Sequence, residues 1–410
     1  MTPAPTRRGA CPSLSAPMPT GDGLLARLNP VGGSLCPRQL AETARAAGRF
    51  GNGMLEITAR GSLQIRGLTQ STAPRLAAFV DGLGVEVRVS VSVETGPLGG
   101  LDPDEITDPR PLAASIREGI DHLGFAARLG PKVSVVVDGG GRSMLDGIKA
   151  DVRLTAGRAQ GRVLWQLALA GDAAGATVIR VLPEREACVA TLERLSAIAA
   201  LGKAGRAKDL LPGAETRRPD TSWDGRSDTV QPFGAIITLI DSRFALRVGL
   251  PFGAIDAATL AGFADTLETL GVAELRLCPG RSLLPLSATR ADAMAVLECA
   301  RAAGLIVDAG DPRLAVVACA GAPACASAHY ATRMLAERIV REAPDLLVPD
   351  TRLHLSGCGK RCAEPTGPSI ALIGGDEGCS IVVNGTSVPS TLQNYLARHG
   401  NMDVHDRRTS

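Results

Sequence analysis

An internal repeat is the feature that most constrains the fold of this chain. Residues 23–68 resemble residues 242–287, and each copy predicts a strand, a turn with Gly and Pro, a helix and two further strands. The helices are predicted from apolar residues at helical spacing, Leu40 and Ala44 in the first copy and Leu260 in the second. A chain built this way is expected to fold with a pseudo-twofold axis and to bind a large ligand at the seam between its halves.

A second, weaker pair of similar segments lies between and after these copies. Residues 165–179 resemble residues 369–383, and Gly171-Asp172 then matches Gly375-Asp376. The units therefore follow the order A-B-A′-B′. Because helices and strands are interleaved with antiparallel hairpins, we predict the α+β class.

Composition excludes several classes of protein. A net charge of +2 does not favour a dedicated nucleic-acid binder, and 3% aromatic residues leave few platforms for stacking bases. The apolar stretches are too short to span a bilayer, and Arg7 and Arg8 are not followed by the apolar run of a signal peptide. We expect a cytoplasmic protein with neither a nucleic-acid nor a membrane partner.

Four of the ten cysteines lie in two close pairs, Cys319 with Cys325 and Cys358 with Cys362. In a reducing compartment such pairs indicate a metal site rather than disulfides. Four thiolates could bind zinc or an iron-sulfur cluster, but the five-residue gap of the first pair fits structural zinc poorly. A 4Fe-4S cluster takes four cysteines. The alternative is that cysteines are simply buried, which we accept for Cys11, Cys36, Cys188, Cys278, Cys299 and Cys379.

The residues around the pairs predict their local structure. A strand is expected to end at Cys319, and an amphipathic helix after Cys325 would place that thiol at a helix N-terminus. Gly357 and Gly359 flank Cys358, so the backbone there can turn and offer amide donors to sulfur.

With the alternating repeats, these cysteine pairs resemble those of the sulfite and nitrite reductase superfamily. The resemblance covers nearly the whole chain, from about Arg8 to about Thr386. It implies two ferredoxin-like half-domains that alternate with two α+β domains around a pseudo-twofold seam. It also implies that the four cysteines hold a 4Fe-4S cluster, and that Cys362 bridges to the iron of sirohaem where sirohaem is bound.

The resemblance also predicts domain boundaries. The predicted units are a flexible N-terminal arm (1–15), a first ferredoxin-like half-domain (16–80), a first α+β domain (81–215), a second ferredoxin-like half-domain (229–300), a cluster-binding α+β domain (301–388) and a C-terminal tail (389–410). Turn-forming stretches at 97–112 and 213–232 are interpreted as linkers.

Within the superfamily, two stretches are similar to a branch that acts in oxygen-dependent cobalamin biosynthesis: "RRGACPSLSAPMPTGDGLLARL" and "HLSGCGKRCAEP". That similarity implies an oxidoreductase that uses dioxygen to hydroxylate the tetrapyrrole precorrin-3A, with an acetate side chain closing a γ-lactone. The glycines of 136–147 do not form a dinucleotide-binding fingerprint. A separate reductase or a ferredoxin is therefore expected to supply electrons.

Oxygen activation could also involve a mononuclear non-haem iron, which usually takes His and carboxylate ligands. His329 and His354 lie near the cysteine pairs in sequence, but no facial triad is apparent. We interpret both histidines as hydrogen-bonded residues near the cluster.

The resemblance also implies substrate contacts. A Thr-x-Arg segment of the superfamily matches Thr58 and Arg60, and Arg66 follows on the same predicted hairpin. A Pro-x-Lys-x-Lys segment matches Lys132 but has Ser134 in place of the second lysine. This thinner cationic pocket argues against sulfite or nitrite. We predict that a multi-carboxylate macrocycle is bound by Arg60, Arg66, Lys132 and Arg142.

Other interpretations stay open at this point. Each of these cations could instead be a solvated or ion-paired surface residue. The same cysteines would serve a sirohaem-dependent sulfite or nitrite reductase. They would also serve a non-enzymatic scaffold stabilised by zinc or a cluster.

Overall fold

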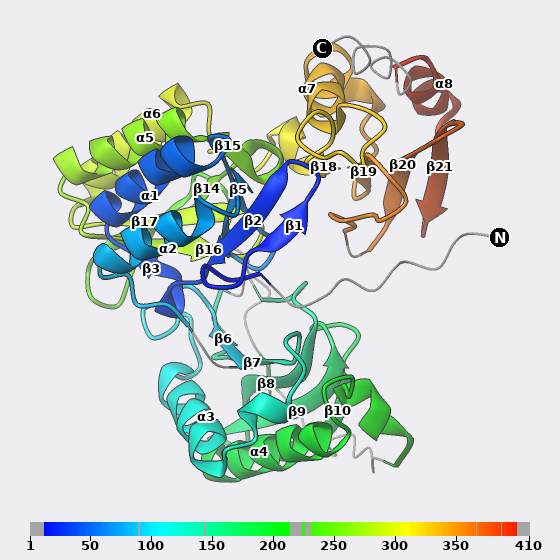
Figure 1. The fold of residues 1–410 in the computed structure, drawn as a ribbon. Coiled ribbons are helices and arrows are strands. Elements are labelled where there is room, and N and C mark those ends of the chain that lie inside the picture. Colours follow the sequence, from blue (N-terminus) through cyan, green and yellow to red (C-terminus); the bar gives the residue numbers. More distant parts are fainter. Residues whose placement is uncertain are drawn as a thin grey trace.

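The computed structural model describes residues 12–88, 91–142, 145–213, 224–225, 231–365, 367–386 and 388–399. These residues form three parts (Figure 1). Two half-domains pack together, a first α+β domain carries α3 (Arg110–Leu123) and α4 (Glu184–Ala200), and a smaller one carries α7 (Thr332–Glu342) and α8 (Ser390–His399). Of the arm predicted at 1–15, residues 1–11 lie outside the described residues.

Each half-domain is an antiparallel sheet with two helices, and the sheets have five strands in the first half-domain and six in the second. Sheet A has the order β1 (Met18–Thr20), β2 (Gly23–Leu28), β5 (Leu63–Leu68), β4 (Met54–Ile57) and β15 (Ala254–Asp256), with α1 (Pro37–Phe50) and α2 (Ala73–Gly82). Sheet C has the order β12 (Ile236–Thr238), β13 (Phe244–Leu246), β17 (Ser282–Ser287), β16 (Glu274–Cys278) and β3 (Ser34–Leu35), and β14 (Val248–Gly249) also pairs with β17. Its helices are α5 (Ala257–Thr269) and α6 (Arg290–Ala302).

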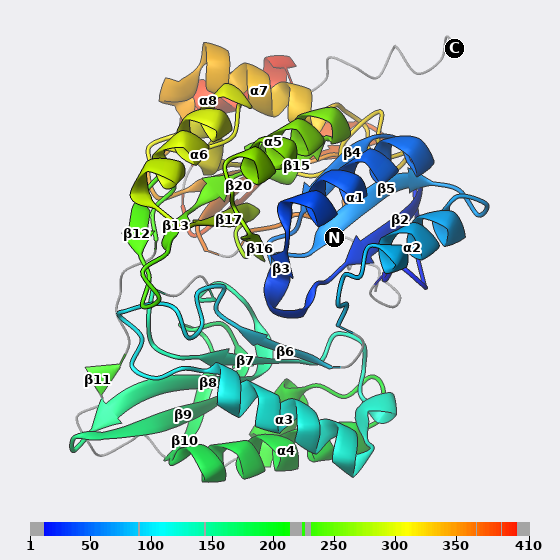
Figure 2. The same cartoon turned by 90° about the vertical axis from the view of Figure 1, so that its left-hand side faces the viewer.

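The two repeats exchange one short strand each. β3 belongs to the first repeat but pairs with β16 of the second, through Leu35 opposite Leu275. β15 belongs to the second repeat but pairs with β4 of the first, through Ile255 opposite Leu55. α1 and α5, which follow these strands, lie side by side (Figure 2). The predicted α+β class and pseudo-twofold arrangement are therefore confirmed.

A single apolar core joins the two half-domains. The helical residues expected from spacing, Leu40, Ala44 and Leu260, are fully buried in this core together with Ile65 and Leu275 of the sheets. Strand alternation explains the sheet residues, because every second side chain of β5 and β16 points to the helices. The repeats consequently cannot separate without exposing this core.

The two α+β domains have related sheets. Sheet D has the order β10 (Thr177–Leu182), β9 (Arg162–Gly171), β8 (Ala150–Ala159), β7 (Ser134–Asp138) and β6 (Ser92–Thr95), and β11 (Asp224–Gly225) also pairs with β8. Sheet E has the order β18 (Val316–Ala318), β19 (Arg352–Ser356), β20 (Ser369–Gly375) and β21 (Gly378–Asn384). Short 3-10 helices connect these elements at Val31–Gly33, Ala126–Arg128, Ala207–Gly213, Pro251–Gly253, Pro312–Ala315 and Pro344–Leu346.

Strand directions correct the second sequence alignment. In sheet D, β6, β7 and β8 are parallel and β9 is antiparallel; in sheet E, β18, β19 and β20 are parallel and β21 is antiparallel. The β20–β21 hairpin thus corresponds to β8–β9, whereas the match of 165–179 with 369–383 had paired it with β9–β10. That match was wrong by one strand, because consecutive hairpins with similar turns resemble one another in sequence.

The predicted C-terminal tail also needs correction. Residues 390–399 form α8, whose Leu392 and Leu396 are buried in the core of the last domain. In Figure 1, α8 lies beside β21 at the edge of this domain. The apolar spacing of Leu392 and Leu396 is the signal that the sequence interpretation passed over.

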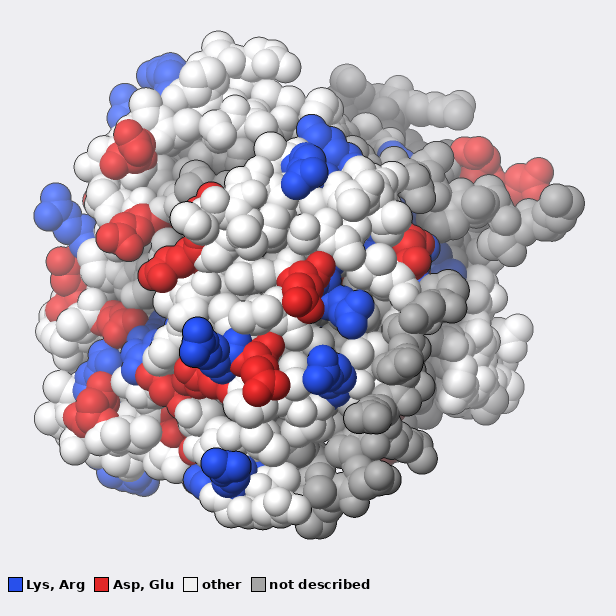
Figure 3. Space-filling view, turned by 90° about the horizontal axis from the view of Figure 1, so that it is seen from below, with Lys and Arg blue, Asp and Glu red and all other residues white. Residues whose placement is uncertain are grey.

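The distribution of charge on the surface and the length of the helices are those expected of a near-neutral globular chain. Viewed from below, acidic and basic side chains are interspersed over the face that carries α3 and α4 (Figure 3). Within the described ranges, no helix has both the length and the apolar character needed to cross a membrane.

The shared core makes a testable prediction. Leu40→Ala should destabilise the protein by about 2–5 kcal/mol, because it leaves a cavity in the packed interface between the repeats. The midpoint of denaturant unfolding measures this. Leu123→Ala is the matched control, since Leu123 is 54% exposed at the end of α3. Equal midpoints for the two variants would contradict the shared core.

Candidate functional site

The two cysteine pairs follow two adjacent parallel strands. β18 ends directly before Cys319, as predicted, and pairs with β19, which ends two residues before Cys358. The carboxyl ends of neighbouring parallel strands lie at the same edge of a sheet. The fold therefore brings the two cysteine loops together at one edge of sheet E.

Backbone hydrogen bonds hold these loops to each other. The Gly357 amide donates to Cys319 Sγ at 3.2 Å, and the His329 amide donates to the Gly357 carbonyl at 2.7 Å. The expectation that glycine beside Cys358 frees an amide for a sulfur atom is met here, with Cys319 as the acceptor. Amide donors to cysteine sulfur are among the features that tune iron-sulfur clusters.

Cys325 does not lie at a helix N-terminus, contrary to the sequence prediction. α7 begins at Thr332, and Cys325 lies in the preceding loop with its amide donating to the Gly321 carbonyl at 2.7 Å. Backbone bonds of His329 and Tyr330 to the neighbouring segments hold this loop out of the helix. The loop conformation therefore positions this thiol, and a helix dipole does not.

The donor set has the chemistry that an iron-sulfur cluster requires. None of the four thiols is in a disulfide; three are half-buried and Cys362 is exposed. Among the residues that the structure describes, no three or more His, Cys, Asp or Glu side chains are already gathered as a metal site. The four thiols on two interlocked loops, with one amide donor to sulfur, fit a 4Fe-4S cluster in ligand type and in number.

A polar network lies on the face of sheet A opposite its helices. In β5, Leu63 and Ile65 point into the core, so Gln64 and Arg66 point to the other face. We call Arg27, Glu56, Gln64 and Arg66 the polar face of sheet A. With the Gln64 amide oriented to suit its neighbours, Gln64 accepts from Arg27 at 2.8 Å and donates to Glu56 at 3.2 Å.

Arg66 is paired with acids of its own half-domain. Its Nε and Nη2 donate to Asp22 at 2.9 and 2.7 Å, and its Nη1 lies 3.5 Å from Glu56 Oε2. Burial acts to raise the pKa of Asp22, but the hydrogen bonds and charge of Arg66 outweigh it and lower that pKa. Asp22 also accepts from Thr20 and Asn52. The predicted substrate contact Arg66 is therefore part of a bidentate ion pair.

The polar face lies against the cysteine loop. Glu56 accepts a hydrogen bond from Arg333 of α7. In the turn before Asp22, a Cβ on Gly21 would lie only 1.9 Å from the Ala326 nitrogen and 2.8 Å from the Cys325 carbonyl carbon. Only glycine permits this approach, so the β1–β2 turn sets the position of the Cys325 loop.

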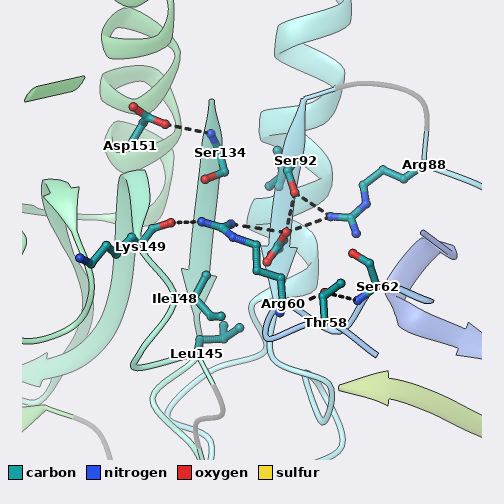
Figure 4. Close-up of polar contacts among 12 residues, drawn as sticks. Thr58, Arg60, Ser62, Arg88, Ser92, Ser134, Leu145, Ile148, Lys149 and Asp151 are labelled. Atoms are coloured by element: carbon teal, nitrogen blue, oxygen red, sulfur yellow. Dashed lines mark hydrogen bonds and ion pairs between the residues drawn. The ribbon is translucent and has the colours of Figure 1, made fainter. Parts of the chain in front are cut away.

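Arg60 extends to the first α+β domain (Figure 4). Its Nη2 donates to the Lys149 carbonyl at the start of β8, and its Nη1 lies 4.0 Å from Glu94 Oε1 of β6. Ser134, the first residue of β7, lies in the same view, and Lys132 just before it is exposed. Arg60 and Lys132 thus lie at the same end of sheet D.

Arg142 lies beyond the opposite end of β7. Its guanidinium is 3.0 Å from Asp102 Oδ1 and 2.7 Å from Asp104 Oδ2. Five strand residues span roughly 16 Å. The four predicted cations therefore do not form one cluster.

A small pocket beside Arg142 contains an unusual carboxyl group. It is lined by Asp102, Glu105, Asp138 and Arg142, among others. Burial, together with the charges of Asp102, Asp108 and Asp138, raises the pKa of Glu105 to about 8, although the Gly100 amide donates to it at 2.7 Å. Glu105 therefore keeps its proton at neutral pH.

The histidines differ in their surroundings. His329 Nδ1 lies 3.7 Å from Asp376 Oδ1. His354 of β19 is fully buried, and neither ring nitrogen has a hydrogen-bond partner in the described part of the chain, contrary to prediction. Burial and the positive charges of Arg361 and Arg281 lower the pKa of His354 to about 4, so its ring is neutral at pH 7.

Comparisons with known proteins agree with this geometry. A family model described as the nitrite/sulfite reductase ferredoxin-like half domain matches residues 16–81. The solved structure of the NirA protein of Mycobacterium tuberculosis is similar with a TM-score of 0.66 and 17% identity, over 89% of this chain and 76% of that one, which shows a shared fold. A curated relative from Sinorhizobium sp., named precorrin-3B synthase, is 39% identical over 389 residues, 94% of this chain and 85% of its own length. This chain belongs to the precorrin-3B synthase family.

For this member of the precorrin-3B synthase family, sequence interpretation missed several residues of the site. Asp22 orients Arg66, Glu105 is a protonated carboxyl group, and the positive charge of Arg281 acts on His354. The available signals were the "TGDG" turn and the "CPGRS" turn, which aligns with "TARGS" in the first repeat. Neither turn shows in sequence which distant element it contacts.

The raised pKa of Glu105 gives a pH prediction. Because the folded protein holds this proton from the ordinary value of 4.5 up to about 8, stability should fall as pH rises through that interval. Glu105→Gln should reduce this decline and raise stability at pH 8 by a few kcal/mol, because each pKa unit between 4.5 and about 8 corresponds to about 1.4 kcal/mol. Unfolding midpoints at pH 5 and pH 8 measure the effect. Glu298→Gln on an exposed residue is the control, and an equal pH dependence in both variants would refute the assignment.

The tight contact of Gly21 gives a second prediction. Gly21→Ala should displace the loop that carries Cys325 and raise the alkylation rate of that thiol several-fold, measured by peptide mass spectrometry. Gly262→Ala is the control, because a Cβ there meets no atom within 4 Å. An unchanged alkylation rate in Gly21→Ala would show that this turn does not set the position of the loop.

Proposed function

We propose that this protein is a precorrin-3B synthase in activity as well as in family. It would hydroxylate precorrin-3A at the carbon between rings A and D, with one atom of dioxygen entering the product and the other leaving as water. An acetate side chain of the substrate would close a γ-lactone. The observation that carries this proposal is the 39% identity to a precorrin-3B synthase over 94% of the chain.

In this proposal, Cys319, Cys325, Cys358 and Cys362 hold a 4Fe-4S cluster. When bound, such a cluster relays single electrons. The Gly357 amide would stabilise negative charge on Cys319, and the Gly21 turn would fix the Cys325 loop beside the polar face of sheet A. The loops would thus hold the cluster next to the seam between the repeats.

The basic residues would bind the carboxylates of the tetrapyrrole. Arg60 and Lys132, at one end of sheet D, are the more exposed of the predicted contacts. Arg66 and Arg142 would each contact a substrate carboxylate while they remain paired with the acidic side chains that already bind them. Ser134 in place of a second lysine supports a macrocycle with dispersed carboxylates over a small dianion.

We further propose that a separate reductase or a ferredoxin supplies the two electrons. The support is that the glycine-rich turn at 136–147 lacks the dinucleotide fingerprint. Exposed Cys362 is the proposed ligand most accessible to a docked donor. Stoichiometric oxidation of NADH by the purified protein alone would overturn this part.

The decisive experiment combines a spectrum with turnover. Protein purified without oxygen should show broad iron-sulfur absorption, iron matched by sulfide, no sirohaem bands, and oxygen-dependent conversion of precorrin-3A when an electron donor is supplied. Strong sirohaem bands together with sulfite or nitrite reduction would assign the chain to the reductase activity of its superfamily.

Cysteine variants test the proposed ligands. Cys358→Ser should lose most of the bound iron and sulfide, with at least a tenfold loss of turnover, because a thiolate ligand is removed. Cys299→Ser is the control, since this half-buried cysteine lies in α6, outside the two loops. Full iron content in Cys358→Ser would contradict the assignment.

A further inference from the structure

Arg352 and His354 lie on the face of sheet E that is opposite its apolar core. Leu353 and Leu355 of β19 point into the core beneath α7, so Arg352 and His354 point to the opposite face. His354 is fully buried there, and neither of its ring nitrogens has a partner among the described residues. A buried, unpaired imidazole is costly unless a ligand group satisfies it.

Arg281 approaches this face from the turn between β16 and β17. Its backbone has a φ of 61°, a left-handed conformation that is uncommon for a residue other than glycine. Its side chain passes over Gly253, where a Cβ would lie 2.3 Å from Arg281 Cδ. The left-handed backbone of Arg281 and the absence of a Cβ at Gly253 together direct this guanidinium to sheet E. A left-handed backbone at a residue other than glycine is typical of functional sites.

Among the residues that the structure describes, the guanidinium of Arg281 has no counter-ion within ion-pair distance. Burial lowers the pKa of Arg281, with Glu56 opposing this effect and Arg352 and Arg333 adding to it. Within the described ranges, the side chain of Arg281 makes no hydrogen bond or ion pair; its only hydrogen bond there is that of its carbonyl, which accepts from the Leu250 amide. The nearby acid Glu56 is already bound by Arg333 and lies 3.5 Å from Arg66. The region therefore carries an excess of positive charge next to an unpaired imidazole.

We propose that Arg281 and His354 form a subsite for a carboxylate. The guanidinium would pair with the anion, and the neutral imidazole would donate a hydrogen bond to it. Neither residue is among the substrate contacts or cluster ligands proposed above. The inference rests on the proposed function only for the source of the carboxylate, which would be a side chain of the tetrapyrrole.

The pseudo-twofold arrangement supports this placement. The turn that carries Arg281 corresponds to the turn that carries Arg60, and the two turns touch, with the Gly280 amide donating to the Ala59 carbonyl at 3.0 Å. Arg60 extends to sheet D, whereas Arg281 extends to sheet E. Two arginines that start from adjacent turns and diverge are suited to carboxylates on different sides of one macrocycle.

The test uses Arg281→Gln, Arg281→Lys and His354→Asn in the full protein. Arg281→Gln should raise KM for precorrin-3A about 10- to 100-fold with little change in kcat, because a charge-assisted contact is lost. Arg281→Lys should recover part of the loss, and His354→Asn should weaken binding less than Arg281→Gln. Arg301→Gln, on an exposed arginine of α6, is the matched control.

A second readout does not depend on the substrate. Inorganic sulfate should raise the unfolding temperature of the wild type and of Arg301→Gln more than that of Arg281→Gln, compared with sodium chloride at equal ionic strength. An equal sulfate effect in all variants, or an unchanged KM in folded Arg281→Gln, would overturn the subsite. If the wild type does not convert precorrin-3A but the sulfate difference is present, the proposed reaction fails and the anion subsite stands.

Discussion

The reciprocal exchange of β3 and β15 is the constraint on which the rest of this structure depends. Each repeat completes the sheet of the other, so a single apolar core holds both half-domains in one fixed relation. The turns after β4 and β16 then meet at the seam, with a backbone hydrogen bond from Gly280 to Ala59. Arg60 and Arg281, which start from these turns, are positioned from this rigid centre.

The two half-domains share a fold but not the chemistry of their exposed sheet faces. Gln64 and Arg66 of sheet A correspond by strand register to Leu284 and Leu286 of sheet C. The leucines pack beneath Leu98 and Leu101, within the stretch expected to be a linker. The polar face of sheet A lies instead against the cysteine loop. Polar side chains on one face and apolar ones on the other break the pseudo-symmetry and leave one side for a charged ligand.

Charge pairing explains why the candidate site was only partly predictable. The two cysteine pairs could be proposed as ligands from spacing alone, because closely spaced thiols and the glycines beside them are local features. The cations were harder, since Arg66 and Arg142 are neutralised by Asp22, Asp102 and Asp104, which lie far from them in sequence. His354 shows the converse, because a histidine expected to be hydrogen-bonded proves to be buried without a partner among the residues that the structure describes.

The sequence by itself determined the duplicated α+β plan, the helices α1 and α5, the strand before Cys319 and the two cysteine pairs, because periodicity and spacing are set within short segments. Only the tertiary structure decided that β3 and β15 change places, that β20–β21 matches β8–β9, and that the charge of Arg281 acts on the buried His354. These outcomes depend on which distant surfaces pack together. Packing is a property of the whole chain, so no local pattern records it.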